Sequence, residues 1–351
     1  MTHRIAIAGI GAVADLHADC VAEIDGAEVV AGSCRTESKG REFAEEHDAR
    51  WFPETDLMLD ETDPDVLIVC TPSGAHLTPT VEAAERGVHV LCEKPLEITT
   101  ERVDKMIVAA NEGNIRLGGV FQQRFDPSVQ RVHEAATEGR FGDLSVGAAY
   151  VPWWRDDDYY RDAWQGTESL DGGGALMNQS IHGVDAIQWL AGAAAGVDEA
   201  NPVEEVVAFT DRRAHADDLM EVEDTAVASI RFRGGALGQI LAATSMYPGS
   251  DKRLQLAGRD GTVEVRDDEI STWEFRDADE GAAESGGDGG GGGSADPMSI
   301  GGGNHRRNIE AFLDAIESGE EFLLDAHEAR KAVEIVEAVY ESAETGEPVR
   351  L

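Results

Sequence analysis

The chain has 351 residues, which is long enough for two domains with full hydrophobic cores. A composition of 42% hydrophobic and 28% charged residues is typical of a globular protein and excludes a disordered one. The formal net charge of −40 disfavours nucleic acids and anionic membranes as partners, because both are themselves negatively charged.

The acidic residues are spread along the whole chain, whereas a partner-binding tail would be local and a cation-storage protein would show clustered ligands. High salt relieves the self-repulsion of such a chain, because screening acts over about 3 Å at 1 M ionic strength. The chain also has only five lysines beside 24 arginines. We therefore expect a protein adapted to a very salty cytoplasm.

Four cysteines occur singly within the first 92 residues, at Cys20, Cys34, Cys70 and Cys92. No CxxC pair is present, so we expect neither a zinc site nor a redox motif, and no metal. Reduced thiols in a cytosol are the simplest interpretation. The sequence shows no signal-peptide pattern and no apolar run of membrane-spanning length, so we expect a cytoplasmic location.

The chain begins with the pattern of a dinucleotide-binding turn. Residues 4–9 predict a strand, a helix follows to about residue 24, and a second strand is predicted at 28–32. Gly9 permits the tight turn, Gly11 lets the backbone approach a pyrophosphate, and Ala14 lets the helix pack closely on the strand. The helix N-terminus would then face the phosphates.

The end of the second strand indicates which dinucleotide is bound. A carboxylate there would hold the ribose hydroxyls of NAD. Ser33, Cys34 and Arg35 stand there instead, and the first carboxylate is Glu37 in the next helix. Ser33 can hydrogen-bond to a 2′-phosphate and Arg35 can pair with it. We therefore predict NADP, with NAD as the alternative.

Strands and helices continue to alternate through residue 121. Strands are predicted at 65–70, 88–92 and 115–121, and helices at 76–86 and 99–111. This alternation predicts a right-handed, doubly wound parallel sheet, so we assign residues 1–121 to a Rossmann domain.

Glu93, Lys94 and Pro95 follow the predicted strand at 88–92. Pro95 ends the strand because it has no N–H to donate. Ligands of open α/β sheets bind at the carboxyl ends of the strands, so Lys94 presents a cation beside the expected cofactor. The alternative is an ordinary ion pair at the start of a helix.

Beyond residue 122 the pattern changes to alternating strands, which fits a large, open, mainly antiparallel sheet with one covered face. The predicted strands are 144–151, 203–210, 224–232, 236–243, 253–257 and 262–266. Helices are predicted at 127–138, 304–318 and 326–345, and a flexible glycine-rich loop at 281–303. We assign residues 122–351 to a second α/β domain.

The stretch after the glycines at 172–174 carries polar groups on an apolar helix. Its spacing predicts that Asn178, His182 and Asp185 lie near one face of that helix. Buried polar side chains need partners, and the glycines permit a ligand to approach closely. The alternative is a core histidine with structural partners.

An aromatic-rich run lies just upstream and includes Trp153, Tyr159, Arg161 and Trp164. Aromatic faces with polar groups between them suit a polyhydroxy ligand, which offers C–H faces and hydroxyl edges. A subunit interface is the competing interpretation, because interfaces are rich in the same residue types.

Three motifs in this order resemble the glucose–fructose oxidoreductase/inositol dehydrogenase/MocA (Gfo/Idh/MocA) family. They are Gly-x-Gly-x-x-Ala from Gly9, Glu-Lys-Pro from Glu93, and Gly-Gly-Gly-x-Leu-x-Asn-x-x-x-His-x-x-Asp from Gly172. The resemblance runs from about residue 4 to the end and suggests an acidic, haloarchaeal-type member. It implies homodimers or homotetramers formed through the second-domain sheet. It also implies NAD(P)-dependent oxidation or reduction of sugars, cyclitols and related polyols.

By position, the resemblance implies that His182 accepts a hydroxyl proton and that Lys94 stabilises the alkoxide. Many members carry Asp where this chain has Asn178, an amide that cannot act as a base but can orient a hydroxyl. The expected catalytic residues are Lys94, His182 and Asn178. The expected cofactor-binding residues are Gly9, Ile10, Gly11, Ala12, Val13, Ser33, Cys34, Arg35, Thr71, Pro72, Ser73, His76, Glu93, Lys94 and Gln122. The expected substrate-binding residues are Lys94, Arg124, Trp153, Tyr159, Arg161, Trp164, Asn178 and His182.

Two other functions fit the same motifs. One is a non-catalytic regulator that binds NAD(P) or a sugar, and the other is a redox-neutral, glycosidase-like enzyme that holds NAD tightly. The presence of both Lys94 and His182 favours a dehydrogenase or reductase. The sequence leaves the substrate and the direction of the reaction open.

Overall fold

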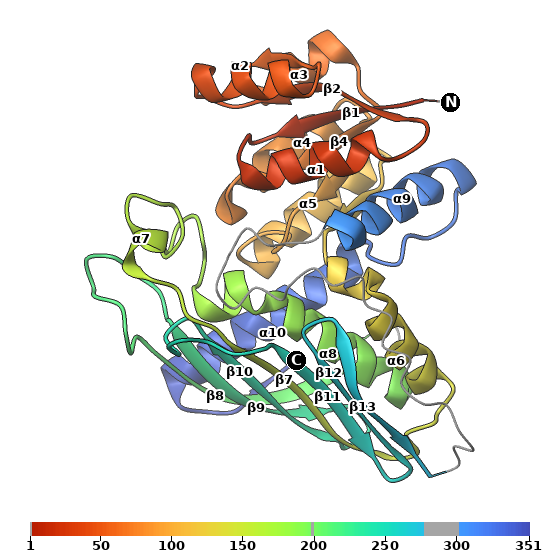
Figure 1. Ribbon diagram of the computed structural model, residues 1–351, viewed down its shortest axis with the longest axis vertical. Helices are drawn as coiled ribbons and strands as arrows, with labels where there is room; N and C mark the ends of the chain where they lie inside the picture. The colour runs from red at the N-terminus through yellow and green to blue at the C-terminus, as the bar shows by residue number, and fades with distance from the viewer. Residues whose placement is uncertain (1, 198–199, 277–301) are drawn as a thin grey trace. The chain divides into compact units, whose positions relative to one another are not determined.

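The structure, a computed structural model, describes residues 2–197, 200–276 and 302–351, which fall into two units (Figure 1). Unit 1 comprises Met1–Gln122 and Gly301–Arg330, and unit 2 comprises Gln123–Ile300 and Lys331–Leu351. The predicted glycine-rich loop lies outside the described residues, except that its last two residues, 302 and 303, begin a helix.

Unit 1 is built on a six-stranded parallel sheet with the strand order β3-β2-β1-β4-β5-β6 (Figure 1). The strands are β1 (His3–Ala8), β2 (Ala27–Ser33), β3 (Arg50–Phe52), β4 (Val66–Val69), β5 (His89–Cys92) and β6 (Leu117–Gly119). The chain runs outward from β1 to β3 and then returns to β4, so the strand order reverses between β1 and β4. This reversal is where α/β sheets bind ligands, and it confirms the predicted Rossmann fold.

The helices of unit 1 include the four predicted ones, namely the helix that runs to about residue 24 and those at 76–86, 99–111 and 304–318. The helices of this unit are α1 (Ala12–Ala22), α2 (Glu37–Glu46), α3 (Thr55–Thr62), α4 (Leu77–Ala84), α5 (Thr100–Glu112) and α9 (Gly302–Ser318). The Thr99 hydroxyl caps α5 by accepting the N–H of Arg102. Helix α9 comes from the C-terminal part of the chain but packs against α1, where the Cys20 thiol donates to the Gly302 carbonyl at 3.3 Å.

Unit 2 is built on an eight-stranded sheet with the strand order β13-β12-β11-β7-β10-β9-β8-β14. The strands are β7 (Leu144–Pro152), β8 (Val203–Asp211), β9 (Thr225–Phe232), β10 (Leu237–Ala243), β11 (Arg253–Gly258), β12 (Gly261–Arg266), β13 (Glu269–Phe275) and β14 (Val349–Arg350). Only the β7–β10 pair is parallel among these strands, which confirms the predicted mainly antiparallel sheet. Strands β13 and β14 were not predicted.

Helices cover one face of this sheet, as the alternation in β9 shows: Ala228 and Ile230 are buried, while Ser229 and Arg231 are exposed. Helix α8 packs on β7, on β11 and on α6. The helices of this part of the chain are α6 (Pro127–Thr137), α7 (Asp157–Tyr160), α8 (Ile181–Ala195) and α10 (Ala326–Thr345). Across all described residues, no helix combines the length and the apolar character needed to cross a membrane.

Candidate active site

The turn between β1 and α1 has the geometry that a dinucleotide requires. Gly9 has a φ of +91°, and a Cβ at this position would lie 2.6 Å from the backbone nitrogen of Thr71, so only glycine fits. Gly11 is the extended N-cap of α1, and a Cβ there would meet nothing within 4 Å. Gly11, Ala12 and Val13 are exposed. This open backbone at a helix N-terminus fits a pyrophosphate.

The end of β2 offers a cation and no carboxylate. Ser33 is buried, and its hydroxyl lies 3.0 Å from the hydroxyl of Thr55. Cys34 is half-buried, and its carbonyl accepts the indole N–H of Trp51 at 3.1 Å. Arg35 is exposed. Of the three residues predicted here, Arg35 is therefore the one best placed to meet a ligand in solvent.

His76 ties the carboxyl ends of β4 and β5 together. Its buried ring bridges two backbone carbonyls, with Nε2 2.8 Å from the oxygen of Thr71 and Nδ1 2.9 Å from the oxygen of Pro95. Burial lowers the pKa of His76. Ser73 is also buried, whereas Thr71 and Pro72 are half-buried. His76 and Ser73 are therefore buried in the protein at this edge of the sheet, and His76 holds the two strand ends together.

Glu93 anchors the Glu-Lys-Pro turn to α1. One carboxylate oxygen accepts a hydrogen bond from Nε2 of His17 at 2.8 Å, and the other accepts one from the backbone N–H of Lys94 at 3.1 Å. His17 is fully buried, and its ring meets the ring of His305 of α9 edge-on at 5.6 Å. Lys94 is half-buried just beyond β5. The carboxylate thus holds the backbone of the predicted catalytic lysine.

We expect ionised Glu93 to stabilise the fold by an amount that depends on pH. Burial alone would raise its pKa, but the hydrogen bond and charge of His17 lower the pKa from 4.5 to about 2. A carboxyl with a lowered pKa stabilises the fold above its unfolded pKa. This stabilisation, roughly 3 kcal/mol, is lost as the pH falls from about 5 to 2.

Denaturant unfolding of the wild type and the Glu93→Gln variant checks this expectation. The difference in unfolding free energy between them should be large at pH 7 and should shrink toward pH 3. Glu317→Gln, which changes an exposed carboxylate beside His3, should produce no such difference. A Glu93→Gln difference that is equal at both pH values would contradict the assignment.

The glycine-rich motif of unit 2 is not one continuous α-helix, so that prediction was wrong. Residues Ala175–Gln179 form a π-helical turn, and α8 begins only after Ser180. The carboxylate of Glu223 accepts the N–H groups of Gly174 at 2.9 Å and of Leu176 at 2.8 Å. This distant carboxylate therefore satisfies two backbone donors at the start of the turn.

Asn178 faces a buried acid that the sequence pattern did not reveal. Its Nδ2 donates to Asp171 at 2.6 Å, and the other oxygen of Asp171 accepts the N–H of Gly166 at 2.7 Å. Asn178 is 6% exposed and Asp171 is 1% exposed. The acid that the resemblance implies at position 178 is therefore replaced by an amide bonded to an acid at position 171. A direct catalytic role of Asn178 stays a prediction.

His182 is half-buried and lines a pocket of unit 2 together with Gln179, Gly183, Trp153 and Tyr150. The other lining residues are Gln123, Val151, Lys252, Arg253 and Leu254. Two of the predicted residues, His182 and Trp153, thus share one pocket. Lys252 was not predicted as a pocket residue. The chain has only five lysines, so each of them could have been considered as a candidate.

Gln179 connects the pocket to the aromatic run. Its Nε2 donates to the hydroxyl of Tyr159 at 2.8 Å, and its Oε1 accepts from Arg155 at 3.0 Å. Arg155 is buried, so its hydrogen bond holds the side chain of Gln179 in place. Arg161 is exposed and Trp164 is half-buried, and neither is among the residues that line the pocket. Contact of these two with a substrate stays a prediction.

Arg124 forms a buried ion pair with Asp185. Its Nε and Nη2 donate to the two carboxylate oxygens at 2.7 and 2.6 Å, and both side chains are fully buried. The guanidinium also lies over the ring of Trp189, 4.9 Å from its centre. Arg124 belongs to η2 (Gln122–Phe125), so the pair fastens this turn to α8. The geometry favours a structural role, and contact of Arg124 with substrate stays a prediction.

Comparisons with known proteins agree with this architecture. Residues 3–119 match the model of an oxidoreductase family with an NAD-binding Rossmann fold, and residues 129–264 match the Gfo/Idh/MocA C-terminal domain. The WlbA dehydrogenase from Bordetella pertussis, solved with NADH and UDP-GlcNAcA, is 30% identical. The match covers 100% of this chain and 99% of that one, with a TM-score of 0.85. The chain belongs to the Gfo/Idh/MocA oxidoreductase family.

Two relatives of this Gfo/Idh/MocA oxidoreductase are named for sugar chemistry. The D-glucoside 3-dehydrogenase of Escherichia coli is 27% identical over 99% of this chain and 97% of its own length. The D-xylose 1-dehydrogenase (NADP(+)) 2 of Haloferax volcanii is 25% identical over 84% of this chain and 83% of its own length.

In this Gfo/Idh/MocA oxidoreductase, restoring the family acid by Asn178→Asp should destabilise the protein. The new carboxylate would lie where an amide now donates to Asp171, and two buried carboxylates at such a distance cannot both ionise. We expect a loss of roughly 1–3 kcal/mol at pH 7, measured by denaturant unfolding. Repulsion between the two carboxylates would favour a protonated form in the folded variant, so the loss should shrink as the pH falls.

The matched control is the exchanged pair Asp171→Asn with Asn178→Asp. This double variant restores one amide and one carboxylate and keeps an oxygen for the N–H of Gly166. It should recover most of the lost stability. A fully stable Asn178→Asp single variant at pH 7 would show that the two side chains do not share a proton-dependent contact.

Proposed function

We propose that this oxidoreductase transfers a hydride between a nicotinamide dinucleotide and a hydroxyl or carbonyl group of a sugar, cyclitol or related polyol. The pocket of unit 2 carries the proposal, because it combines His182 with two aromatic side chains, Trp153 and Tyr150, and the amide of Gln179. Aromatic faces pack on the C–H faces of a sugar ring, and amides bond its hydroxyls. The named relatives act on the same class of compound.

In the proposed reaction, His182 accepts the proton of the substrate hydroxyl and Lys94 stabilises the developing alkoxide. A bound nicotinamide supplies the hydride acceptor. Asn178, held by Asp171, orients a substrate hydroxyl. Glu93 fixes the backbone from which Lys94 extends. We assign cofactor binding to residues 1–121 and substrate binding to residues 122–351.

We propose NADP as the preferred cofactor, with NAD as the alternative. Arg35 is exposed at the end of β2, and the position that would bind ribose hydroxyls through a carboxylate holds none. A guanidinium pairs well with a 2′-phosphate. The Haloferax volcanii relative, by its name, uses NADP(+).

A substrate panel in molar KCl with NADP⁺ and NAD⁺ tests the function. It includes aldoses, alkyl glucosides, inositols and a UDP-linked uronic acid. We expect turnover of one of these classes with NADP⁺ preferred. Arg35→Ala should raise the KM for NADP⁺ by about tenfold or more without changing the KM for NAD⁺. The control Arg41→Ala, which removes an exposed cation paired with Glu37, should change neither.

Two results would overturn the dehydrogenase assignment. Saturable NADP binding without turnover of any compound would indicate the non-catalytic regulator. A dinucleotide that stays bound through purification, with substrate conversion but no NADPH formation, would indicate the redox-neutral enzyme. An Arg35→Ala variant that keeps its preference for NADP⁺ would contradict the cofactor assignment alone.

We also propose that the protein is a haloarchaeal-type enzyme of a salty cytoplasm. The net charge of −40 and the halophilic relative support this assignment. Thermal unfolding measured across a KCl series should show a midpoint temperature that rises as KCl increases to molar concentrations, because salt screens the self-repulsion of the folded chain. A midpoint independent of KCl would contradict it.

The outer face of the unit 2 sheet supports a homodimer or homotetramer. Phe209 is 76% exposed and Leu237 is 53% exposed. Phe209 pairs with Val227 across β8 and β9, and Leu237 pairs with Val146 across β10 and β7, so the apolar groups extend over several strands. We propose that a second copy covers this face, because exposed apolar patches mark interaction sites.

Replacing Phe209 by Glu should therefore shift the protein toward the monomer, since a carboxylate cannot be buried there without a partner. Light scattering after size-exclusion chromatography in molar KCl measures the mass. Val108→Glu, which changes an exposed apolar residue of α5, should leave the mass unchanged. A wild type that is already monomeric would refute the proposed interface.

A further inference from the structure

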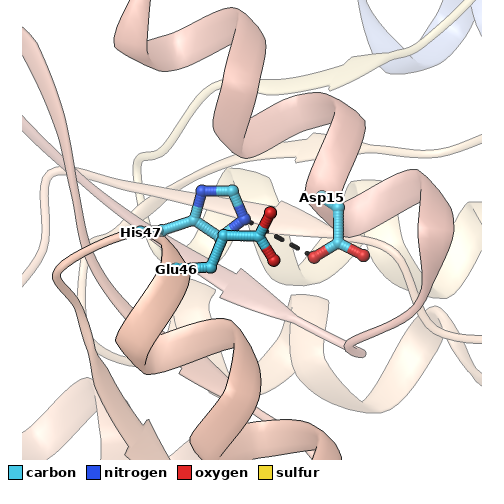
Figure 2. Close-up of side chains that lie close together, drawn as sticks. All are labelled: Asp15, Glu46 and His47. Carbon is cyan, nitrogen blue, oxygen red and sulfur yellow. Dashed lines mark ion pairs between the residues drawn. The ribbon is translucent and has the colours of Figure 1, made fainter.

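A cluster of possible metal ligands occurs in unit 1 and shares no residue with the pocket of unit 2. Asp15 lies in the first turn of α1, Glu46 is the last residue of α2, and His47 is its C-cap (Figure 2). Each offers one ligand atom, and the three atoms lie within 4.8 Å of one another. The two helices bring these groups together from segments that show no metal-binding spacing in the sequence.

His47 is the observation that points to a ligand. Its side chain is only 8% exposed, and its buried Nε2 has no hydrogen-bond partner. Buried ring nitrogens in proteins are normally hydrogen-bonded. The ring packs on Phe43, with ring centres 4.6 Å apart, and Nε2 points toward the carboxylate of Asp15 (Figure 2).

The separation between His47 and Asp15 is informative. Nε2 lies 3.5 Å from the nearer oxygen of Asp15, which is too long for a good hydrogen bond. Two ligands bound at about 2.0–2.2 Å in a tetrahedral metal site lie roughly 3.4 Å apart. The two side chains are therefore spaced as ligands of one ion, and the exposed side chain of Glu46 is free to complete the set.

We propose that Asp15, Glu46 and His47 bind one divalent transition-metal ion, with Zn²⁺ as the test ion. An imidazole nitrogen with two carboxylate oxygens suits Zn²⁺ or Co²⁺, whereas Mg²⁺ and Ca²⁺ prefer oxygen ligands alone. The ion holds the C-terminal end of α2 to the first turn of α1. Its role is structural, and water fills its remaining coordination position.

The competing interpretation is a simple ion pair between His47 and Asp15, with Glu46 solvated. A chain with a net charge of −40 also binds divalent cations diffusely, so the presence of metal alone decides nothing. The test therefore compares variants, in molar KCl to suppress diffuse binding, and measures stoichiometry as well as affinity.

Isothermal titration of chelator-treated protein with Zn²⁺ is the experiment. The wild type should bind one ion at this site, and Asp15→Asn and His47→Gln should each raise its Kd by at least about tenfold. His3→Gln is the matched control, because His3 already contacts Glu317 directly at 2.9 Å and should not influence binding. Mg²⁺ should compete poorly.

Thermal unfolding of the same proteins supplies a second measurement. Zn²⁺ should raise the midpoint of the wild type and of His3→Gln, but not of the two ligand variants, because the ion binds only the folded state. Without metal, Asp15→Asn should have the wild-type midpoint, since that side chain is partly exposed and its loss leaves the fold intact.

The absorption spectrum of the Co²⁺-bound protein tests whether a cysteine binds the ion instead. A thiolate charge-transfer band would show cysteine ligation and overturn the proposal. Equal Zn²⁺ affinity in the wild type and His47→Gln, or no binding by the wild type, would also overturn it. These measurements contain no dinucleotide or sugar, so their outcome is independent of the proposed dehydrogenase activity.

Discussion

Replacing His182 by alanine should lower kcat by about 10²–10⁴-fold, the usual contribution of a general base. The side chain is half-buried on the pocket that also holds Trp153 and Gln179, so substrate binding should be largely kept and KM should change little. Steady-state kinetics with the best substrate of the panel measure both effects.

His327→Ala is the matched control, since His327 is exposed on α10 and should leave the kinetics unchanged. Lys94→Ala in the His182→Ala background should remove most of the remaining activity, because in the proposed mechanism Lys94 stabilises the same developing charge. A His182→Ala variant with near-wild-type turnover would show that another group accepts the proton. Unchanged cofactor binding in that variant would confirm that only the chemical step was affected.

Replacing Asp185 by asparagine should destabilise the protein by about 3–5 kcal/mol, because it removes the carboxylate charge that faces the buried guanidinium of Arg124. Both side chains are 0% exposed, so water cannot replace the lost partner. The free energy of unfolding in molar KCl measures the effect. Arg124→Met with Asp185→Leu should recover most of the loss, since the double variant removes both buried charges together.

The control for this prediction is Asp143→Asn, which breaks a solvent-exposed contact with Arg259 at 3.1 Å. Exposed ion pairs contribute little, so its unfolding midpoint should match the wild type. A small effect of Asp185→Asn, similar to that of Asp143→Asn, would contradict the assignment. A double apolar variant as unstable as the single variant would instead show that the specific geometry of the pair matters.

The asparagine at position 178 illustrates how tertiary contacts change an interpretation. When the sequence is compared with the family pattern, Asn178 stands where many members carry an aspartate, so the candidate active site lacks an acid at this position. Asp171 lies within hydrogen-bond distance of it, so the region keeps one buried carboxylate and gains an amide donor. The two residues are seven positions apart, with the glycines at 172–174 and the start of the π-helical turn between them.

The sequence alone determined the features that depend on local pattern. The spacing of Gly9, Gly11 and Ala14 predicts the dinucleotide turn. Apolar strands separated by helices predict the parallel sheet, and the alternation of apolar residues predicts the antiparallel one. Pairings between distant residues were decided by the tertiary structure. Arg124 meets Asp185 across 61 positions, and Glu223 caps a turn 49 positions earlier. Such pairs follow from how strands and helices pack, which no local periodicity records.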